Sequence, residues 1–246
     1  MYTTIKNQQV YFQKVGLGKD LVLLHGWGTD VSSFWPSIEV LKNHFTIWLI
    51  DLPGMGRSQP PKKSWTISDY ARLVEEFILQ QKIKKPILLG HSFGGRITIK
   101  LASLNPKILG KIILEDSAGL SRKKGIKNTL LKIFTKITKY LIPDIFNLRE
   151  RVKIRIYQIL KSDYKRGALR ETFLKTIQED LSSDCQKISL DTLIIWGEED
   201  QSTPLKDGKR MYQLIKNSKL AILEGVGHTP HIKDPERFSY YVKDFA

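Results

Sequence analysis

The chain has 246 residues and a formal net charge of +15 at pH 7, a length that suits one large α/β domain with an insertion. Without a signal-peptide pattern or an apolar run approaching the ~20 residues of a membrane span, we expect a cytoplasmic protein. The sequence has no zinc-type His/Cys spacing and no phosphate- or dinucleotide-binding glycine motif, so we expect no cofactor.

The first apolar runs predict strands over residues 9–15 and 21–24. The second strand leads into His25–Gly28, a glycine-containing loop whose backbone N–H groups can stabilise charge on a reacting carbonyl oxygen. The elements expected next are a strand over 45–50, the loop Asp51–Ser58 and a helix over 69–81.

The sequence Gly90–Gly94 places Ser92 between an apolar run and a helical pattern. Residues 86–89 predict a buried strand, and residues 95–102 predict a helix. A strand that enters a helix through G-x-S-x-G places the serine at the apex of a sharp turn, with its hydroxyl exposed above the sheet. The alternative is an ordinary strand-to-helix loop that contains a serine. The context favours a nucleophile.

A nucleophilic serine needs a histidine base, and the histidine needs an acid that orients it. The run 192–196 predicts a strand that ends shortly before Asp200, and the run 220–223 precedes His228. Because parallel strands end at one edge of a sheet, we expect Ser92, Asp200 and His228 to meet there.

Residues 121–183 interrupt the alternation of strands and helices and carry only helical patterns. Within this segment, residues 121–175 hold 16 Lys and Arg against 4 Asp and Glu, a net charge of +12. The amphipathic pattern over 126–141 places Phe134 on the apolar face, opposite lysines. These lysines either are simply solvated or contact an anionic membrane surface, an acidic carrier protein or an anionic substrate. No nucleic-acid-binding module accompanies the charge, so nucleic acid is not an expected partner.

Several of these stretches together resemble the α/β-hydrolase superfamily over nearly the whole chain. They are Leu23–Gly28, Asp51–Ser58, Gly90–Gly95, Gly197–Pro204 and Gly227–His228. The first two look most like the serine carboxylesterase branch that includes pimeloyl-carrier-protein methyl esterases. In those enzymes a Trp typically precedes the nucleophile, where this chain has His91. A serine at position 92 argues against dehalogenases and epoxide hydrolases, which carry Asp there.

The resemblance implies an α/β-hydrolase fold with a mostly parallel central sheet flanked by helices. Residues 1–120 and 184–246 would form the core domain, and residues 121–183 would form a helical cap inserted after the sixth strand. In this family such a cap covers the active site.

The resemblance also implies a catalytic triad of Ser92, Asp200 and His228. The oxyanion hole would use the backbone N–H groups of Trp27 and Phe93, one after an early strand and one after the nucleophile. The side chains of Trp27 and Phe93, together with Phe134, are the candidates for substrate contact.

Two other residues compete for triad roles. Asp116 follows the strand predicted over 109–114, where some family members carry the acid, and is the alternative to Asp200. His231, three residues after His228, is the alternative base. The family spacing favours Asp200 and His228.

The expected activity is that of a serine hydrolase that cleaves a small carboxylic ester through an acyl-enzyme. A thioesterase, a lipase or a carbon–carbon bond hydrolase on the same core is the alternative within enzymes. A ligand receptor with this fold and little turnover is the alternative outside them. The single cysteine, Cys185, excludes an internal disulfide and fits a reducing compartment.

Overall fold

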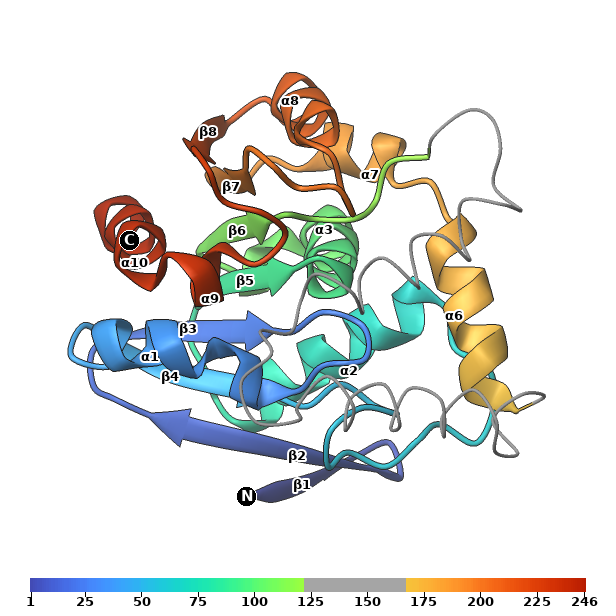
Figure 1. The fold of residues 1–246 in the computed structure, drawn as a ribbon. Helices are drawn as coiled ribbons and strands as arrows, with labels where there is room; N and C mark the ends of the chain where they lie inside the picture. The colour runs from blue at the N-terminus through green and yellow to red at the C-terminus, as the bar shows by residue number, and fades with distance from the viewer. Residues whose placement is uncertain (122–166) are drawn as a thin grey trace, which may run out of the picture.

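A computed structural model describes residues 1–121 and 167–246 and shows a central sheet with helices on both faces (Figure 1). The strands are β1 (Tyr2–Ile5), β2 (Gln8–Val15), β3 (Lys19–Leu24), β4 (Phe45–Ile50), β5 (Ile87–His91), β6 (Lys111–Glu115), β7 (Thr192–Gly197) and β8 (Ser218–Leu223). The α-helices are α1 (Trp35–Leu41), α2 (Ile67–Gln80), α3 (Phe93–Leu104), α6 (Ala168–Gln178), α7 (Ser182–Lys187), α8 (Leu205–Leu214), α9 (Pro230–Lys233) and α10 (Pro235–Phe245). Short 3₁₀ helices are η1 (Val31–Phe34) and η2 (Pro106–Ile108).

Within the described residues, the eight strands are ordered β1-β2-β4-β3-β5-β6-β7-β8. The strand β2 is antiparallel to both neighbours, and all pairs from β4 to β8 are parallel. The carboxyl ends of β3 and of β5 to β8 therefore share one edge of the sheet. This arrangement confirms the predicted α/β-hydrolase fold, with the insertion between β6, the sixth strand, and β7.

Both faces of the sheet are buried, since helices cover each of them. Neighbouring residues of each central strand point to opposite faces and so belong to different cores. In β3, Val22 and Leu24 belong to the core that packs against α2, α3, α7 and α8. Leu21 and Leu23 belong to the second core, which packs against α1 and α10. Residues 21–24 of this strand therefore have no polar face, which explains why their sequence is a continuous apolar run.

The N-terminal strand β1 was not among the predicted elements. It forms a hairpin with β2, in which Ile5 pairs with Gln8. The two turn residues, Lys6 and Asn7, have φ of 48° and 64°, as type I′ hairpin turns require. The segment Tyr2–Ile5 is short and half polar, so the apolar pattern did not indicate a strand.

The helix predicted over 69–81 begins slightly earlier, at Ile67, because Thr66 caps it. The Thr66 side chain accepts a hydrogen bond from the Asp69 N–H, and the Asp69 carboxylate accepts one from the Thr66 N–H. This reciprocal capping box satisfies two N–H groups at the helix start.

The described ends of the insertion lie next to each other. The Leu181 N–H donates to the Gly119 carbonyl at 2.9 Å, and the Ser121 N–H donates to the Asp180 carboxylate at 3.1 Å. In the chain, helix α6 begins just after the undescribed residues and ends just before this junction. Most of the basic residues of the insertion lie outside the described residues.

The expected boundary at residue 183 falls inside α7. Lys100 of α3 holds this helix, since its Nζ lies 2.8 Å from an Asp184 oxygen and 3.0 Å from a Glu179 oxygen. Cys185 is buried in the core there, and burial raises the pKa of its thiol to about 12. No helix of the described ranges has the length and apolar character needed to cross a bilayer.

Helix α2 offers a test of the packing. Replacing the fully buried Phe77 with Ala should lower the free energy of unfolding by about 3–5 kcal/mol, because it leaves a cavity. The matched control is Leu79→Ala in the same helix, at a side chain that is 56% exposed, which should change that free energy by less than about 0.5 kcal/mol. Urea unfolding measures both, and equal losses would contradict the assigned orientation of α2.

Candidate active site

Ser92 lies in a strained turn between β5 and α3, with φ of 51° and ψ of −105°. Such a backbone is uncommon for a residue with a Cβ atom and persists where the surroundings hold it. A Cβ on Gly90 would lie 2.4 Å from the Gly94 backbone, and a Cβ on Gly94 would lie 2.2 Å from the Leu24 carbonyl oxygen. The two glycines therefore permit the close approach that forms the turn.

The structure brings the three residues of the predicted triad together. The Ser92 Oγ lies 3.1 Å from His228 Nε2, and His228 Nδ1 lies 2.7 Å from Asp200 Oδ2. The three residues follow β5, β8 and β7, so all of them lie at the carboxyl edge of the sheet. The contacts form one continuous line from hydroxyl to imidazole to carboxylate.

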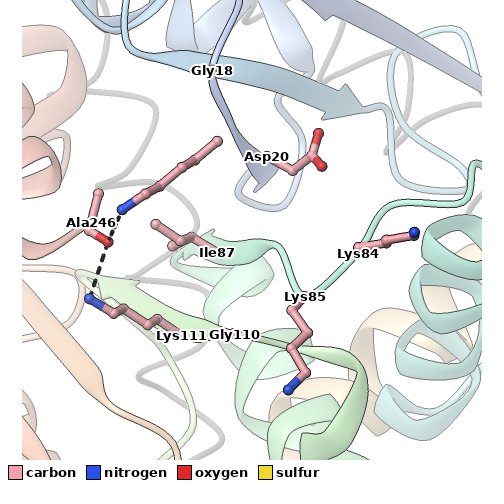
Figure 2. Close-up of a pocket in the computed structure, with 9 residues that line it drawn as sticks. Gly18, Asp20, Lys84, Lys85, Ile87, Gly110, Lys111 and Ala246 are labelled. Carbon is pink, nitrogen blue, oxygen red and sulfur yellow. Dashed lines mark hydrogen bonds between the residues drawn. The ribbon is translucent and has the colours of Figure 1, made fainter.

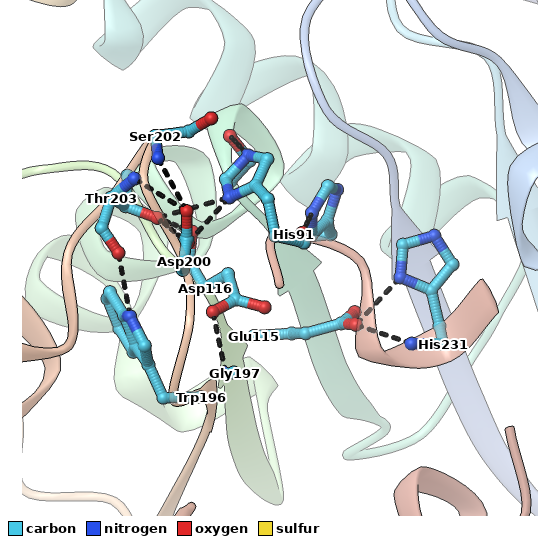
Figure 3. A network of polar contacts seen from close by, with 11 residues as sticks. His91, Glu115, Asp116, Trp196, Gly197, Asp200, Ser202, Thr203 and His231 are labelled. Atoms are coloured by element: carbon cyan, nitrogen blue, oxygen red, sulfur yellow. Dashed lines mark hydrogen bonds and ion pairs between the residues drawn. The ribbon is translucent and has the colours of Figure 1, made fainter. Parts of the chain in front are cut away.

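Asp200 is fixed by its own loop (Figure 3). Its Oδ1 accepts the N–H groups of Ser202 at 2.6 Å and Thr203 at 3.0 Å, and its Oδ2 accepts the Thr203 hydroxyl at 2.6 Å. Burial raises the pKa of Asp200, but hydrogen bonds from His228 and Thr203 outweigh burial and leave that pKa below its usual value. Asp200 is therefore an ionised acceptor for the imidazole.

Asp116, the alternative acid, lies beside Asp200 (Figure 3), and the ligand atoms of Asp116, Asp200 and His228 all lie within 4.8 Å of one another. Its Oδ1 accepts the Gly197 N–H at 3.0 Å, and its Oδ2 has no hydrogen-bond partner among the described residues. Burial, followed by the charges of Asp200 and Glu115, raises the pKa of Asp116 well above its usual value. The carboxylate that bonds to the His228 ring is that of Asp200.

Asp116, Asp200 and His228 also form a group, within the described ranges, whose ligand atoms could hold a metal ion, as these atoms all lie within 4.8 Å of one another. However, His228 Nδ1 is already bonded to Asp200 and its Nε2 to Ser92. The bonds in place suit proton transfer between Ser92 and His228, with Asp200 as hydrogen-bond acceptor, better than metal coordination.

The alternative base, His231, is buried and faces Glu115 (Figure 3). The Glu115 Oε1 lies 2.7 Å from the His231 Nδ1 and accepts the His231 N–H at 2.9 Å. His231 is therefore bonded to Glu115 at the end of β6, below the triad. The residue that bonds to the Ser92 hydroxyl is His228.

His91, which precedes the nucleophile, supports the loop that carries His228. Its Nε2 lies 2.8 Å from the His228 carbonyl oxygen. Burial, followed by the neighbouring rings of His231 and His228, lowers the pKa of His91 well below its usual value. A neutral His91 that donates its Nε2 proton to this carbonyl fits both observations.

The loop predicted to hold the oxyanion lies beside the serine turn. His25 joins it to the next loop, because His25 Nδ1 lies 2.7 Å from the Gly26 carbonyl and Nε2 accepts the Leu52 N–H at 3.0 Å. The Trp27 ring packs edge-on against the Phe93 ring, with centroids 4.9 Å apart. The side chains of Trp27 and Phe93, whose backbone N–H groups are the predicted oxyanion donors, are therefore neighbours.

The aromatic cluster extends to α6. The ring of Phe173 lies 4.9 Å from the Trp27 ring, and the Tyr70 ring lies 5.3 Å from the Phe93 ring. The sequence analysis did not single out Phe173 or Tyr70, since each gives only the apolar spacing of an ordinary helix. Phe134, the third candidate for substrate contact, lies outside the described residues.

A cavity of about 370 Å³ opens at the opposite, amino-terminal edge of the sheet (Figure 2). Lys19 and Lys111 reach the Ala246 carbonyl there, at 2.9 and 3.2 Å, whereas Lys84 and Lys85 extend away from it (Figure 2). The residues that line this cavity include no histidine and no serine, so it lacks the serine–histidine pair found at the carboxyl edge.

The mostly parallel sheet, with a serine turn after β5 and an insertion after β6, defines an α/β-hydrolase-type enzyme. Residues 21–239 match the model of the alpha/beta hydrolase family, and the chain belongs to that family.

Curated relatives have a similar length. The chain is 29% identical over 242 residues to the uncharacterized hydrolase YugF of Bacillus subtilis, covering 92% of this chain and 89% of that protein. It is 28% identical over 253 residues to a pimeloyl-(acyl-carrier protein) methyl ester esterase of Aliivibrio fischeri, covering 96% of each. It is also 28% identical over 265 residues to a 2-hydroxy-6-oxononadienedioate/2-hydroxy-6-oxononatrienedioate hydrolase of Escherichia coli, covering 98% and 91%.

Solved structures show the same fold. A membrane phospholipase A described as a bacterial virulence factor superimposes with a TM-score of 0.86 at 21% identity, covering 100% of this chain and 84% of that one. A meta-cleavage product hydrolase of Pseudomonas fluorescens IP01 superimposes with a TM-score of 0.80 at 20% identity, covering 100% and 96%.

The raised pKa of Asp116 predicts a pH dependence of stability. The folded state keeps the Asp116 proton to a higher pH than the unfolded state does, so the contribution of Asp116 to stability falls as pH rises above about 4, by up to about 1.4 kcal/mol per pH unit. Asp116→Asn removes this titration.

The variant should therefore gain stability relative to the wild type as the pH rises from 4 to 7. Urea unfolding at several pH values measures the difference in unfolding free energy. A difference that stays constant over this range would show that Asp116 ionises normally in the folded protein.

Proposed function

We propose that the chain is a serine hydrolase that cleaves carboxylic esters through an acyl-enzyme, with Ser92 as nucleophile, His228 as base and Asp200 as the orienting acid. The observation that supports this most directly is the pair of contacts at 3.1 Å from Ser92 to His228 and 2.7 Å from His228 to Asp200. Nucleophile, base and orienter thus each lie within hydrogen-bonding reach of the next.

In the first step, neutral His228 accepts the Ser92 proton at Nε2 while Oγ attacks the ester carbonyl. Asp200 accepts the His228 Nδ1 proton in a hydrogen bond, which fixes the tautomer and stabilises the imidazolium that forms. The hydrogen bonds to both Asp200 oxygens keep this carboxylate ionised during the step.

The attack places negative charge on the carbonyl oxygen, and backbone N–H groups stabilise it. Phe93 is the first residue of α3, where an N–H has no acceptor within the helix. The contact between the Trp27 and Phe93 rings supports Trp27 as the second donor. His228 then protonates the leaving alcohol, and water releases the acyl group by the same route.

The relatives support two reactions on these residues. Similarity to a methyl ester esterase supports ester cleavage, which we favour because it needs no group beyond the triad and the oxyanion donors. Similarity at the same identity to the Escherichia coli hydrolase supports carbon–carbon bond cleavage as the second candidate.

We also propose that residues 121–183 include a cap over the site. The contact between Phe173 of α6 and Trp27 supports this position. The net charge of +12 over residues 121–175 supports an anionic partner, and we favour an anionic acyl group over a membrane surface or an acidic carrier protein.

Replacing Ser92 with Ala should lower kcat/KM for a p-nitrophenyl ester by at least about 10³-fold, because the nucleophile is lost. Ser189→Ala, at an exposed serine remote from the site, is the matched control and should keep wild-type turnover. Circular dichroism checks that both variants are folded. Turnover in Ser92→Ala at the wild-type rate would refute the assignment, and tight binding of an ester without turnover in the wild type would indicate a receptor.

A panel of methyl esters tests the substrate class. Esters whose acyl group ends in a carboxylate should give a kcat/KM at least about tenfold above neutral esters of the same length at low salt. The difference should shrink as salt screens the charges. Equal kcat/KM values for charged and neutral esters would contradict a preference for an anionic acyl group. The basic residues of 121–175 would then serve a different partner.

A further inference from the structure

The site contains two carboxyl groups next to one imidazole. Asp116 directly follows β6, Asp200 follows β7, and His228 follows β8, and these three strands are neighbours in the sheet. The ligand atoms of the three side chains all lie within 4.8 Å of one another. The proposed mechanism uses one of these carboxyl groups and leaves Asp116 without a role.

Asp116 is held in this position by its backbone. Its φ is 40°, which is a left-handed conformation, and the residue is fully buried. Its N–H donates to the Ile195 carbonyl at 3.0 Å, and its carbonyl oxygen lies 2.9 Å from the Thr203 Oγ1. With the bond from the Gly197 N–H to Oδ1, these contacts fix the carboxyl beside Asp200 (Figure 3).

The hydrogen bonds favour a negative charge on Asp200 over one on Asp116. Asp200 accepts bonds from Ser202 and Thr203 and from His228, and these bonds favour a carboxylate. Asp116 accepts one, from Gly197, and its Oδ2 has no partner within the described residues. Two adjacent buried carboxyl groups do not both ionise readily. The proton therefore belongs on Asp116.

The other titratable groups near Asp116 act in the same direction. Glu115, its neighbour in β6, is buried and bonded to His231, and its charge opposes ionisation of Asp116. Burial and the charge of Asp200 are the larger causes that raise the pKa of Asp116. A protonated Asp116 turns its free oxygen into a hydrogen-bond donor toward Asp200, which resolves the missing partner.

We propose that Asp116 is a second acid of the site, protonated in the resting protein, which donates a hydrogen bond to Asp200 and replaces it as the partner of His228 when position 200 carries a neutral residue, as in Asp200→Asn. In that case Asp116 releases its proton to solvent, and its carboxylate accepts the Nδ1 proton of His228 in a hydrogen bond. Asp116 acts through Asp200 and His228 and is a positioning residue. This inference rests on the proposed function.

A double-mutant cycle tests the proposal through kcat/KM for a p-nitrophenyl ester. In the wild-type background, Asp116→Asn should lower kcat/KM by less than about tenfold, because an amide still donates to Asp200. In the Asp200→Asn background, the same substitution should cost at least about tenfold more, because it removes the carboxylate that has taken over.

The pH profile gives a readout that a purely structural role would not move. For Asp200→Asn, kcat/KM should rise with pH as Asp116 loses its proton, and the double variant should lack this rise. Glu199→Gln, at an exposed carboxylate in the loop of Asp200, is the matched control and should behave like the wild type. Asp116→Gly, which tolerates the left-handed backbone, replaces Asp116→Asn if that variant does not fold.

An equal cost of Asp116→Asn in both backgrounds, with no difference in pH profile, would overturn the second-acid proposal. This result is distinct from a failure of the proposed function, which Ser92→Ala reports. Loss of turnover in Ser92→Ala together with additive costs in the cycle would contradict only the role of Asp116. Retained turnover in Ser92→Ala would contradict the triad itself.

Discussion

The close passage of the chain from β5 into α3 is the constraint on which the site depends. Because Gly90 and Gly94 lack side chains, the first turn of α3 packs directly against the backbone at Leu24. This packing holds Ser92 in its left-handed conformation and directs the start of α3 to the same edge as its hydroxyl. The loops after β3, β7 and β8 then need only reach that edge to supply the proposed oxyanion donor, acid and base. The parallel sheet ensures that they do, since all these strands end there.

Beneath this edge, the polar side chains form a layered network rather than isolated pairs. Asp200 holds the charge that His228 needs, and His91 holds the His228 backbone from below. The Glu115–His231 pair lies next to His91 and is buried. The Asp200 carboxylate accepts several N–H and O–H donors, as a buried charge in a low-dielectric setting requires. Asp116 accepts one hydrogen bond, from Gly197, and this difference between the two neighbouring acids supports the second-acid proposal.

The parts of the molecule that the sequence predicted are those with a local signature. Strands buried on both faces appear as continuous apolar runs, and Ser92, Asp200 and His228 each follow such a run directly. The strand β1 was not predicted, because half of its residues are polar and only its pairing with β2 identifies it as a strand. The protonation of Asp116 and the approach of Phe173 to Trp27 depend on burial and on neighbours far along the chain, which no local pattern encodes. The residues of the core could therefore be assigned from sequence, but the electrostatic state and the aromatic surroundings of the site could not.

The hydrogen bond between Leu181 and Gly119 has a further consequence. The chain leaves the core after β6 and returns to it at the same point. The inserted segment is therefore a loop whose two ends are held together. The entropic cost of closing such a loop grows only slowly with its length. The segment can therefore vary in length, charge and shape without disturbing the register of β6 and β7. The proposed reaction residues therefore stay in the core while the inserted segment changes, and, if that segment contacts the substrate as proposed, substrate preference can change separately from the reaction.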